Sequence, residues 1–122
     1  CHVILRGGKE PNYDATSVAD ACQQSDKAGV QCRLMVDASH GNSRKQAENQ
    51  KHVIADVASQ ISAGERRIFG VMIESHLVAG NQSLSPGKTL VYGQSITDGC
   101  IGWDDSVALL NTLAEGVRQR RA

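Results

Sequence analysis

The sequence has few aromatic residues, no excess of charge of either sign and no long apolar run. Aromatic residues make up 3% of the 122 residues, and 13 Lys and Arg balance 13 Asp and Glu to a net charge of zero. A neutral chain exerts no long-range attraction on phosphate backbones or anionic lipid, which disfavours nucleic acid and membrane surfaces as partners. No apolar run approaches the ~20 residues that cross a bilayer, and the first residues lack the pattern of a signal peptide. We therefore expect a cytoplasmic protein.

The cysteines lack the spacing of a metal or redox motif. Cys1, Cys22, Cys32 and Cys100 include no Cys-x-x-Cys pair. Isolated cysteines are most often small buried apolar residues, and we expect that role for Cys22 and Cys32. Disulfides are not needed in a chain of this size and composition. The cysteines therefore indicate neither a zinc knuckle nor a redox site.

The chain does contain a threefold repeat of an apolar strand, a polar turn and a helix. Strands are expected at residues 2–5, 33–36 and 68–73, helices at 16–28, 43–64 and from 104 onward, and a long loop at 77–103. Ser17 with Asp20, and Ser43 with Gln46, have the spacing of capping boxes. Asp104 is expected to cap the last helix. Continuous apolar strands, each followed by a helix, indicate a parallel sheet covered by helices.

Three such units leave an apolar strand edge on each side of the sheet. The chain is then either part of an eight-unit barrel of ~250 residues or a small, open, doubly wound sheet. Polar residues follow the end of every strand, namely Arg6, Asp37, His40, Glu74 and His76. This pattern favours the barrel, because barrel enzymes carry their active sites there. Cys1 already begins a buried strand without an initial Met, so we expect the natural protein to start earlier.

His40, Glu74 and Asp98 are the candidate metal ligands. One imidazole and two carboxylates from three loops suit a divalent ion such as manganese, iron, cobalt or zinc. From residue types alone, His40 also fits a hydrogen-bonding loop residue and Asp98 a turn residue. Arg6, followed by two glycines, fits a phosphate clamp and equally an ion pair with a neighbouring loop.

Four segments together carry a family resemblance. They are CHVILRGGKEPNY at residues 1–13, MVDASHGNS at 35–43, GVMIESHLV at 70–78 and YGQSITDGCIGW at 92–103. In this order they closely resemble the C-terminal third of the class I 3-deoxy-D-arabino-heptulosonate 7-phosphate (DAHP) synthases, the bacterial enzymes regulated by aromatic amino acids. The resemblance covers essentially the whole chain.

The resemblance implies an α/β fold: a TIM (βα)8 barrel of which residues 1–122 form the sixth to eighth units of one catalytic domain. It implies a transferase that condenses phosphoenolpyruvate with erythrose 4-phosphate, giving DAHP and phosphate. This reaction is the first step of the shikimate pathway to chorismate and the aromatic amino acids. A divalent metal ion assists it, and the full enzyme is expected to be a homo-oligomer.

The resemblance also implies roles for individual residues. His40, Glu74 and Asp98 match three of the family's metal ligands, which makes His40 a catalytic residue as well. Asp98 is expected to contact a substrate hydroxyl, and Arg6 matches the arginine that binds the phosphate of phosphoenolpyruvate. The family's fourth ligand is a cysteine at the end of the first barrel strand, which this chain lacks. Gly41 stands where the family usually has Ala and is expected to loosen the turn that carries His40.

Two other functions remain open from the sequence. With three of four metal ligands, the fragment by itself is expected to be inactive, and the alternative is a non-catalytic fragment that self-associates through its strand edges. A small metal hydrolase would need a metal-bound water and a base within these residues.

Overall fold

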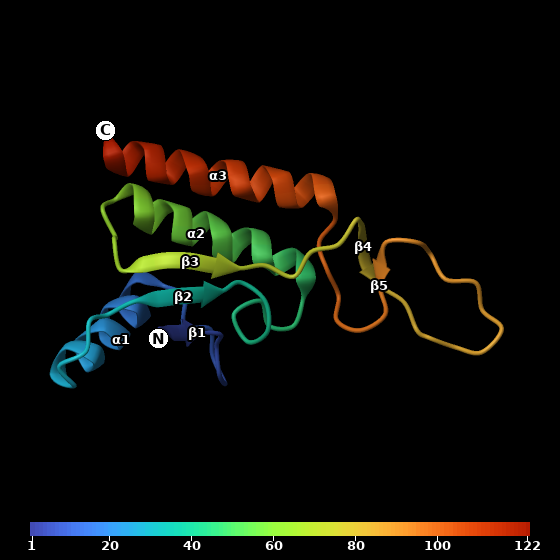
Figure 1. The fold of residues 1–122 in the computed structure, drawn as a ribbon, viewed down its shortest axis with the longest axis horizontal. Helices are drawn as coiled ribbons and strands as arrows, with labels where there is room; N and C mark the ends of the chain where they lie inside the picture. Colours follow the sequence, from blue (N-terminus) through green and yellow to red (C-terminus); the bar gives the residue numbers. More distant parts are fainter.

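The computed structural model describes all residues, 1–122, as an α/β fold (Figure 1). Its elements in chain order are β1 (Val3–Leu5), α1 (Ala15–Lys27), β2 (Leu34–Asp37), the short 3-10 helix η1 (Ala47–Asn49), α2 (Gln50–Ser62), β3 (Ile68–Met72), β4 (Val78–Asn81), β5 (Gln94–Ser95) and α3 (Trp103–Arg121). Strands β1, β2 and β3 form one parallel sheet in that order. The predicted parallel sheet is therefore confirmed.

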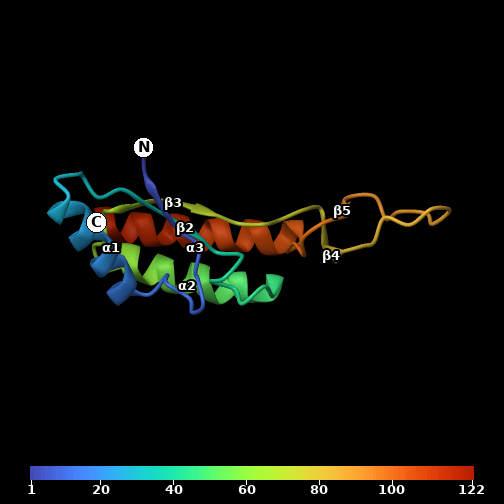
Figure 2. The same cartoon turned by 90° about the horizontal axis from the view of Figure 1, so that it is seen from below.

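One face of this sheet carries the core. Leu34 and Val36 of β2, and Ile54 and Val57 of α2, are fully buried against one another within one apolar cluster. Helix α3 packs closely on α2, since a Cβ added at Gly116 would lie 2.7 Å from the carbonyl oxygen of Ala58. Figure 2 shows the strands along one side of the molecule and helices α1 and α2 along the other.

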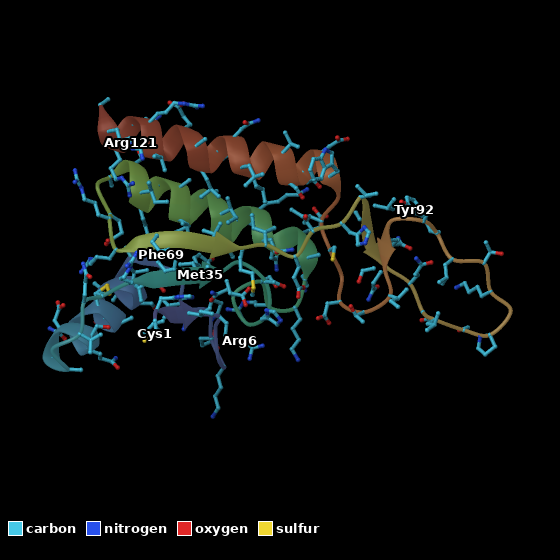
Figure 3. The ribbon with its side chains drawn as sticks, in the orientation of Figure 1. Cys1, Arg6, Met35, Phe69, Tyr92 and Arg121 are labelled. Carbon is cyan, nitrogen blue, oxygen red and sulfur yellow. A yellow bond between two sulfur atoms is a disulfide. The ribbon has the colours of Figure 1, made fainter.

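The opposite face of the sheet is open. Ile4, Phe69 and Met72 are exposed by 47%, 46% and 36%, and Figure 3 shows Met35 and Phe69 on the sheet without a covering helix. A doubly wound sheet carries helices on both faces. The structure therefore contradicts the open doubly wound alternative.

Two helices start one residue earlier than expected. The carboxylate of Asp14, not Ser17, caps α1: its Oδ1 accepts the Ser17 N–H at 3.0 Å and its Oδ2 accepts the Ser17 hydroxyl at 2.7 Å. The side-chain hydrogen bond from Ser17 is the main reason that the pKa of Asp14 is lowered. Helix α3 begins at Trp103 after Gly102, without a side-chain cap, and Asp104 lies in its first turn.

Helix α2 starts seven residues later than predicted. Residues 39–46 form a turn in which His40, Arg44 and Lys45 have φ angles of 49°, 53° and 59°. A left-handed residue cannot continue an α-helix. The N–H of Lys45 instead donates to the His40 carbonyl at 2.9 Å and closes the turn. The first residues of the predicted helix, 43–46, are thus part of the turn that holds His40.

The structure joins Cys22 and Cys32 by a disulfide, so the expectation of unbonded thiols was wrong. Both residues are buried in the apolar cluster, as expected. The chain reverses at Gly29, whose φ is 68°, and this brings the two Cα atoms to 5.1 Å, within the range that a disulfide needs. The bond ties α1 to the segment that enters β2.

The predicted loop is partly regular and projects from the body. We call residues 77–102 the arm, which contains the two-stranded parallel β4–β5 sheet and extends away from the helices in Figure 1. Bridges between Ser75 and Ile101, and between Gly80 and Cys100, close its root. None of the helices has the length and apolarity to cross a membrane.

Candidate metal site at the strand ends

All four predicted site residues line one hollow. Because β1, β2 and β3 run parallel, the residues that follow them gather at one edge of the sheet. A cavity of about 310 Å³ there is lined by Arg6, Ser39, His40, Lys45, Ala47, Glu74, Asp98 and Gly99. A wider depression beside the end of α2, near Ser59 and Gly64, contains neither an imidazole nor a predicted ligand.

His40 is oriented by Asp37. Its Nδ1 lies 2.7 Å from Oδ2 of Asp37, a carboxylate that is only 1% exposed at the end of β2. This partner assigns the Nδ1 proton to a bond with the carboxylate and leaves the Nε2 lone pair free. Nε2 lies 3.6 Å from Oε1 of Glu74. Asp37 therefore prepares the imidazole to act as a ligand on the side that faces Glu74.

Glu74 is held through both its side chain and its backbone. The hydroxyl of Ser39, which is buried on the His40 turn, donates to Oε2 of Glu74 at 2.8 Å. The carboxamide of Gln50 bonds the Glu74 backbone N–H and carbonyl at 2.8 and 3.0 Å. The second oxygen, Oε1, remains directed toward His40. The carboxylate is thus fixed next to the imidazole without an ion pair to a cation.

Asp98 reaches the same cavity from the arm. Ligand atoms of His40, Glu74 and Asp98 all lie within 4.8 Å of one another. Asp98 is exposed, and its turn is held by the Asn81 amide, which donates to the Thr97 carbonyl at 2.8 Å. Atoms that share an ion at about 2.1 Å lie ~3–3.5 Å apart, so a small movement of this turn suffices. The donor set fits a borderline divalent metal.

Asn42 links the loop of Arg6 to the turn of His40. Its buried amide donates to the carbonyls of Leu5 and Asp37 at 3.0 and 2.8 Å. Its backbone N–H donates to the Arg6 carbonyl at 3.2 Å. The Arg6 side chain forms no salt bridge, so the alternative of an ion pair with a neighbouring loop is not realised. Figure 3 labels Arg6 at the end of β1.

Gly41 does not loosen the turn, contrary to the sequence-based expectation. A Cβ at Gly41 would lie 2.7 Å from the Gly7 carbonyl carbon, and one at Gly7 would lie 2.5 Å from that of Gly41. Both distances are far below ordinary contact, so the two glycines allow two backbones to touch. Gly41 therefore packs the Arg6 loop tightly against the His40 turn.

Sequence reasoning missed Ser39, Lys45 and Gln50 at this site. A signal existed for Gln50, because it precedes Val53 and Ile54 by three and four residues and so falls on the apolar face of α2. His76 follows β3 but is exposed, and its Nδ1 accepts the Leu77 N–H at 2.8 Å. It does not join the ligand cluster.

Cys100 lies near the acidic ligands as a thiol. Burial is the largest cause that raises its pKa, and the negative charges of Glu74 and Asp98 add to the effect. Its sulfur is not among the clustered donor atoms.

The sequence and the fold were compared with known proteins. The chain is 58% identical over 121 residues to the Phe-sensitive phospho-2-dehydro-3-deoxyheptonate aldolase of Escherichia coli K12. The aligned residues cover 99% of this chain and 35% of that protein. It is 51% identical to the Trp-sensitive enzyme of Enterobacter agglomerans, over 98% of this chain and 34% of that one. The solved phospho-2-dehydro-3-deoxyheptonate aldolase of Francisella tularensis superposes with a TM-score of 0.94 at 48% identity, over 99% and 35% of the two chains.

These relatives are longer than the sequence described here, which spans about a third of their length. The sequence model of the DAHP synthetase I family matches residues 1–111. That match covers the three strands, the predicted ligands and the first half of α3. The chain therefore belongs to the DAHP synthetase I family.

Proposed function

We propose that this chain supplies the sixth to eighth βα units of a TIM barrel, and that the completed barrel is a DAHP synthase. It condenses phosphoenolpyruvate with erythrose 4-phosphate and releases phosphate, the first step of the shikimate pathway. Three parallel strands with every helix on one face support the barrel. Residues 1–122 are then the C-terminal part of one catalytic domain that works in the cytoplasm as a homo-oligomer.

One observation carries this proposal. Ligand atoms of His40, Glu74 and Asp98 come within 4.8 Å of one another, and Arg6 lines the same cavity. A metal site next to an unpaired guanidinium suits a reaction between an aldehyde and a phosphate ester. Because the chain is neutral overall, anionic substrates are held by these local groups rather than by a general field.

Each residue has a defined task in this proposal. A bound manganese, iron, cobalt or zinc ion supplies Lewis-acid polarisation of the erythrose 4-phosphate aldehyde. His40 offers its Nε2 as a ligand because Asp37 occupies Nδ1. Arg6 binds the phosphate of phosphoenolpyruvate through charge-assisted hydrogen bonds. Asp98, which is exposed at the cavity, also contacts a substrate hydroxyl.

The fragment by itself is proposed to be inactive. It has three of the four metal ligands that the family resemblance implies. Arg6 is the only cation that the resemblance assigns to a substrate within these residues. The remaining substrate-binding cations are proposed to come from the other barrel units.

A chimera tests the function. Residues 1–122 replace the matching third of the Escherichia coli Phe-sensitive relative, and consumption of phosphoenolpyruvate is followed with Mn²⁺ and erythrose 4-phosphate. We expect the chimera to be active, the fragment alone to be inactive, and the His40→Ala chimera to lose both activity and Mn²⁺ binding. A folded chimera that binds Mn²⁺ through His40 but consumes no phosphoenolpyruvate would refute the proposal.

A second candidate function is self-association without catalysis. The open sheet face exposes Ile4, Phe69 and Met72, and the outer edges of β1 and β3 are unpaired in the sheet. Sedimentation of the isolated chain tests this candidate, which predicts a defined oligomer that does not respond to Mn²⁺. The hydrolase alternative needs a base beside the three predicted ligands, and the other ionisable side chains that line the cavity are the cations Arg6 and Lys45.

A further inference from the structure

Gln50 is a polar side chain in a fully buried place. It is the first residue of α2, has no exposed surface, and is unused by the proposed chemistry. Its Oε1 accepts the backbone N–H of Glu74 at 2.8 Å, and its Nε2 donates to the backbone carbonyl of the same residue at 3.0 Å. Both polar ends of one carboxamide are therefore committed to one predicted metal ligand.

The two hydrogen bonds between Gln50 and Glu74 replace those that a neighbouring strand would make if the sheet continued. The last registered pair between β2 and β3 joins Asp37 to Met72, so Glu74 lies beyond the strand ladder. A backbone N–H and carbonyl at such a point need other partners if they are shielded from water. The carboxamide of Gln50 offers one acceptor and one donor, as a neighbouring strand would.

The Glu74 carbonyl is also the point where the arm meets the sheet. It accepts a second hydrogen bond from the N–H of Ile101 at 3.1 Å. Ile101 is fully buried and lies three residues after Asp98. Gln50 thus contacts the backbone at the junction between the segment that carries Glu74 and the segment that carries Asp98.

We propose that Gln50 is a positioning residue of the metal site: its carboxamide fixes the Glu74 backbone so that Oε1 faces His40. This rests on the proposed function, because it assigns Gln50 a role at the same metal site. Ser39 holds only Oε2 of the carboxylate. Without Gln50 the backbone of Glu74 loses its N–H partner, and the carboxylate no longer has a single orientation toward Nε2 of His40.

The test compares two glutamines of one helix in the chimera. Gln50→Met removes both hydrogen bonds to Glu74 and keeps an unbranched side chain of similar length. Gln60→Met is the matched control, because the Gln60 amide donates to the Tyr13 carbonyl at 2.8 Å and to Asp56 on its own helix. Mn²⁺ affinity is measured by titration calorimetry, and the visible spectrum of bound Co²⁺ reports ligand geometry.

Residues that orient metal ligands typically change affinity by about 10- to 100-fold. We expect that loss of Mn²⁺ affinity, with an altered Co²⁺ spectrum, for Gln50→Met. Gln60→Met should lower the melting temperature but leave the Mn²⁺ affinity within about twofold, because its hydrogen bonds lie outside the site. A purely structural role for Gln50 would lower the melting temperature alone.

Two results would overturn the proposal, and they distinguish a wrong role for Gln50 from a wrong metal site. Equal Mn²⁺ affinity in both variants would refute the role of Gln50 and leave the metal site standing. No Mn²⁺ binding by the unchanged chimera would refute the metal site together with the role of Gln50. If Gln50→Met does not fold, Gln50→Glu keeps the shape and the acceptor for the Glu74 N–H but loses the donor to its carbonyl. A loss of Mn²⁺ affinity of about tenfold is then expected, and an unchanged affinity would refute the role of Gln50.

Discussion

The predicted metal ligands come from two regions that are built differently. His40 and Glu74 lie on the rim, by which we mean the ends of β1–β3 with residues 6–7, 37–42 and 74. There Asp37, Ser39 and Asn42 are almost completely buried, and each is hydrogen-bonded. Asp98 lies on the arm, where Leu84 is 69% and Tyr92 is 90% exposed.

The arm is stabilised mainly by its own polar side chains. The amide of Gln82 donates to the carbonyls of Val91 and Gln94 at 2.8 and 3.0 Å and accepts the Val91 N–H at 2.8 Å. Gln50 and Gln82 thus both use a side-chain carboxamide to bond backbone N–H and carbonyl groups. Gln50 does so in the buried core beneath the rim, and Gln82 does so within the arm. Two of the predicted ligands are therefore positioned by the buried core, while the third lies on a loop that is mostly exposed.

The largest change in Mn²⁺ affinity is expected when a predicted ligand is replaced, and its size should differ between the rim and the arm. In the chimera, Glu74→Gln should weaken Mn²⁺ binding by roughly 100- to 1,000-fold, because losing a charged ligand costs more than the ~10- to 100-fold of a residue that only orients a ligand. Asp98→Asn should cost about tenfold less, because the exposed arm can admit a water as a replacement ligand. Titration calorimetry checks both values, and equal losses would remove the distinction between rim and arm.

Backbone packing provides the next test. Gly7→Ala should destabilise the chimera by about 2–3 kcal/mol in urea denaturation, because Gly7 has a φ of 78° and its new Cβ would meet the Gly41 backbone. Gly87→Ala in the arm has a similar φ of 75° but free space around it, so about 1 kcal/mol is expected. Gly8→Ala, with neither constraint, should be close to neutral. A Gly7 variant no worse than the Gly87 variant would contradict the close contact.

A smaller loss of Mn²⁺ affinity is expected when Asp37, which orients the His40 imidazole, is changed. Asp37→Asn keeps an acceptor for Nδ1 of His40 but removes the charge, and Mn²⁺ affinity should fall about tenfold. Asp26→Asn, which changes an exposed carboxylate of α1, serves as the control. Unchanged affinity in the Asp37 variant would show that the turn alone orients His40.

The smallest effect is predicted for the arm. Gln82→Ala removes three hydrogen bonds and should speed amide exchange of Val91 about tenfold through local opening. Global stability should change by less than about 0.5 kcal/mol, and Mn²⁺ affinity by less than about twofold, because the bonds lie far from the core. A global loss comparable to that of Gly7→Ala would show that the arm belongs to the cooperative core.

Prediction from the sequence succeeded where signals are local. Apolar runs located all three strands of the parallel sheet, and the polar residues after them located Arg6, His40 and Glu74 in one cavity. Prediction failed where a helix start and a closed turn can both provide hydrogen-bond partners for the same backbone groups. Ser43 and Gln46 have capping-box spacing, yet residues 39–46 form a turn closed by the Lys45 N–H.

Contacts between distant segments were beyond the reach of the sequence. The disulfide between Cys22 and Cys32 depends on how tightly the chain reverses at Gly29. The close backbone contact at Gly41 was not predicted, because its neighbour across the contact is Gly7, 34 residues earlier in the chain. Neither spacing nor propensity reports such a neighbour.

The parallel α/β repeat, the family and the types of group at the site can be read from the amino-acid sequence, because periodicity and residue chemistry are properties of short segments. Which of these groups are neighbours depends on the tertiary packing. It placed Asp37 behind His40, joined Gln50 to Glu74, and brought Asp98 from the arm to the rim. Each of these contacts depends on the fold. The buried groups of Asp37 and Gln50 take the partners that the packing brings within hydrogen-bond distance, and the exposed Asp98 is placed by the path of the arm.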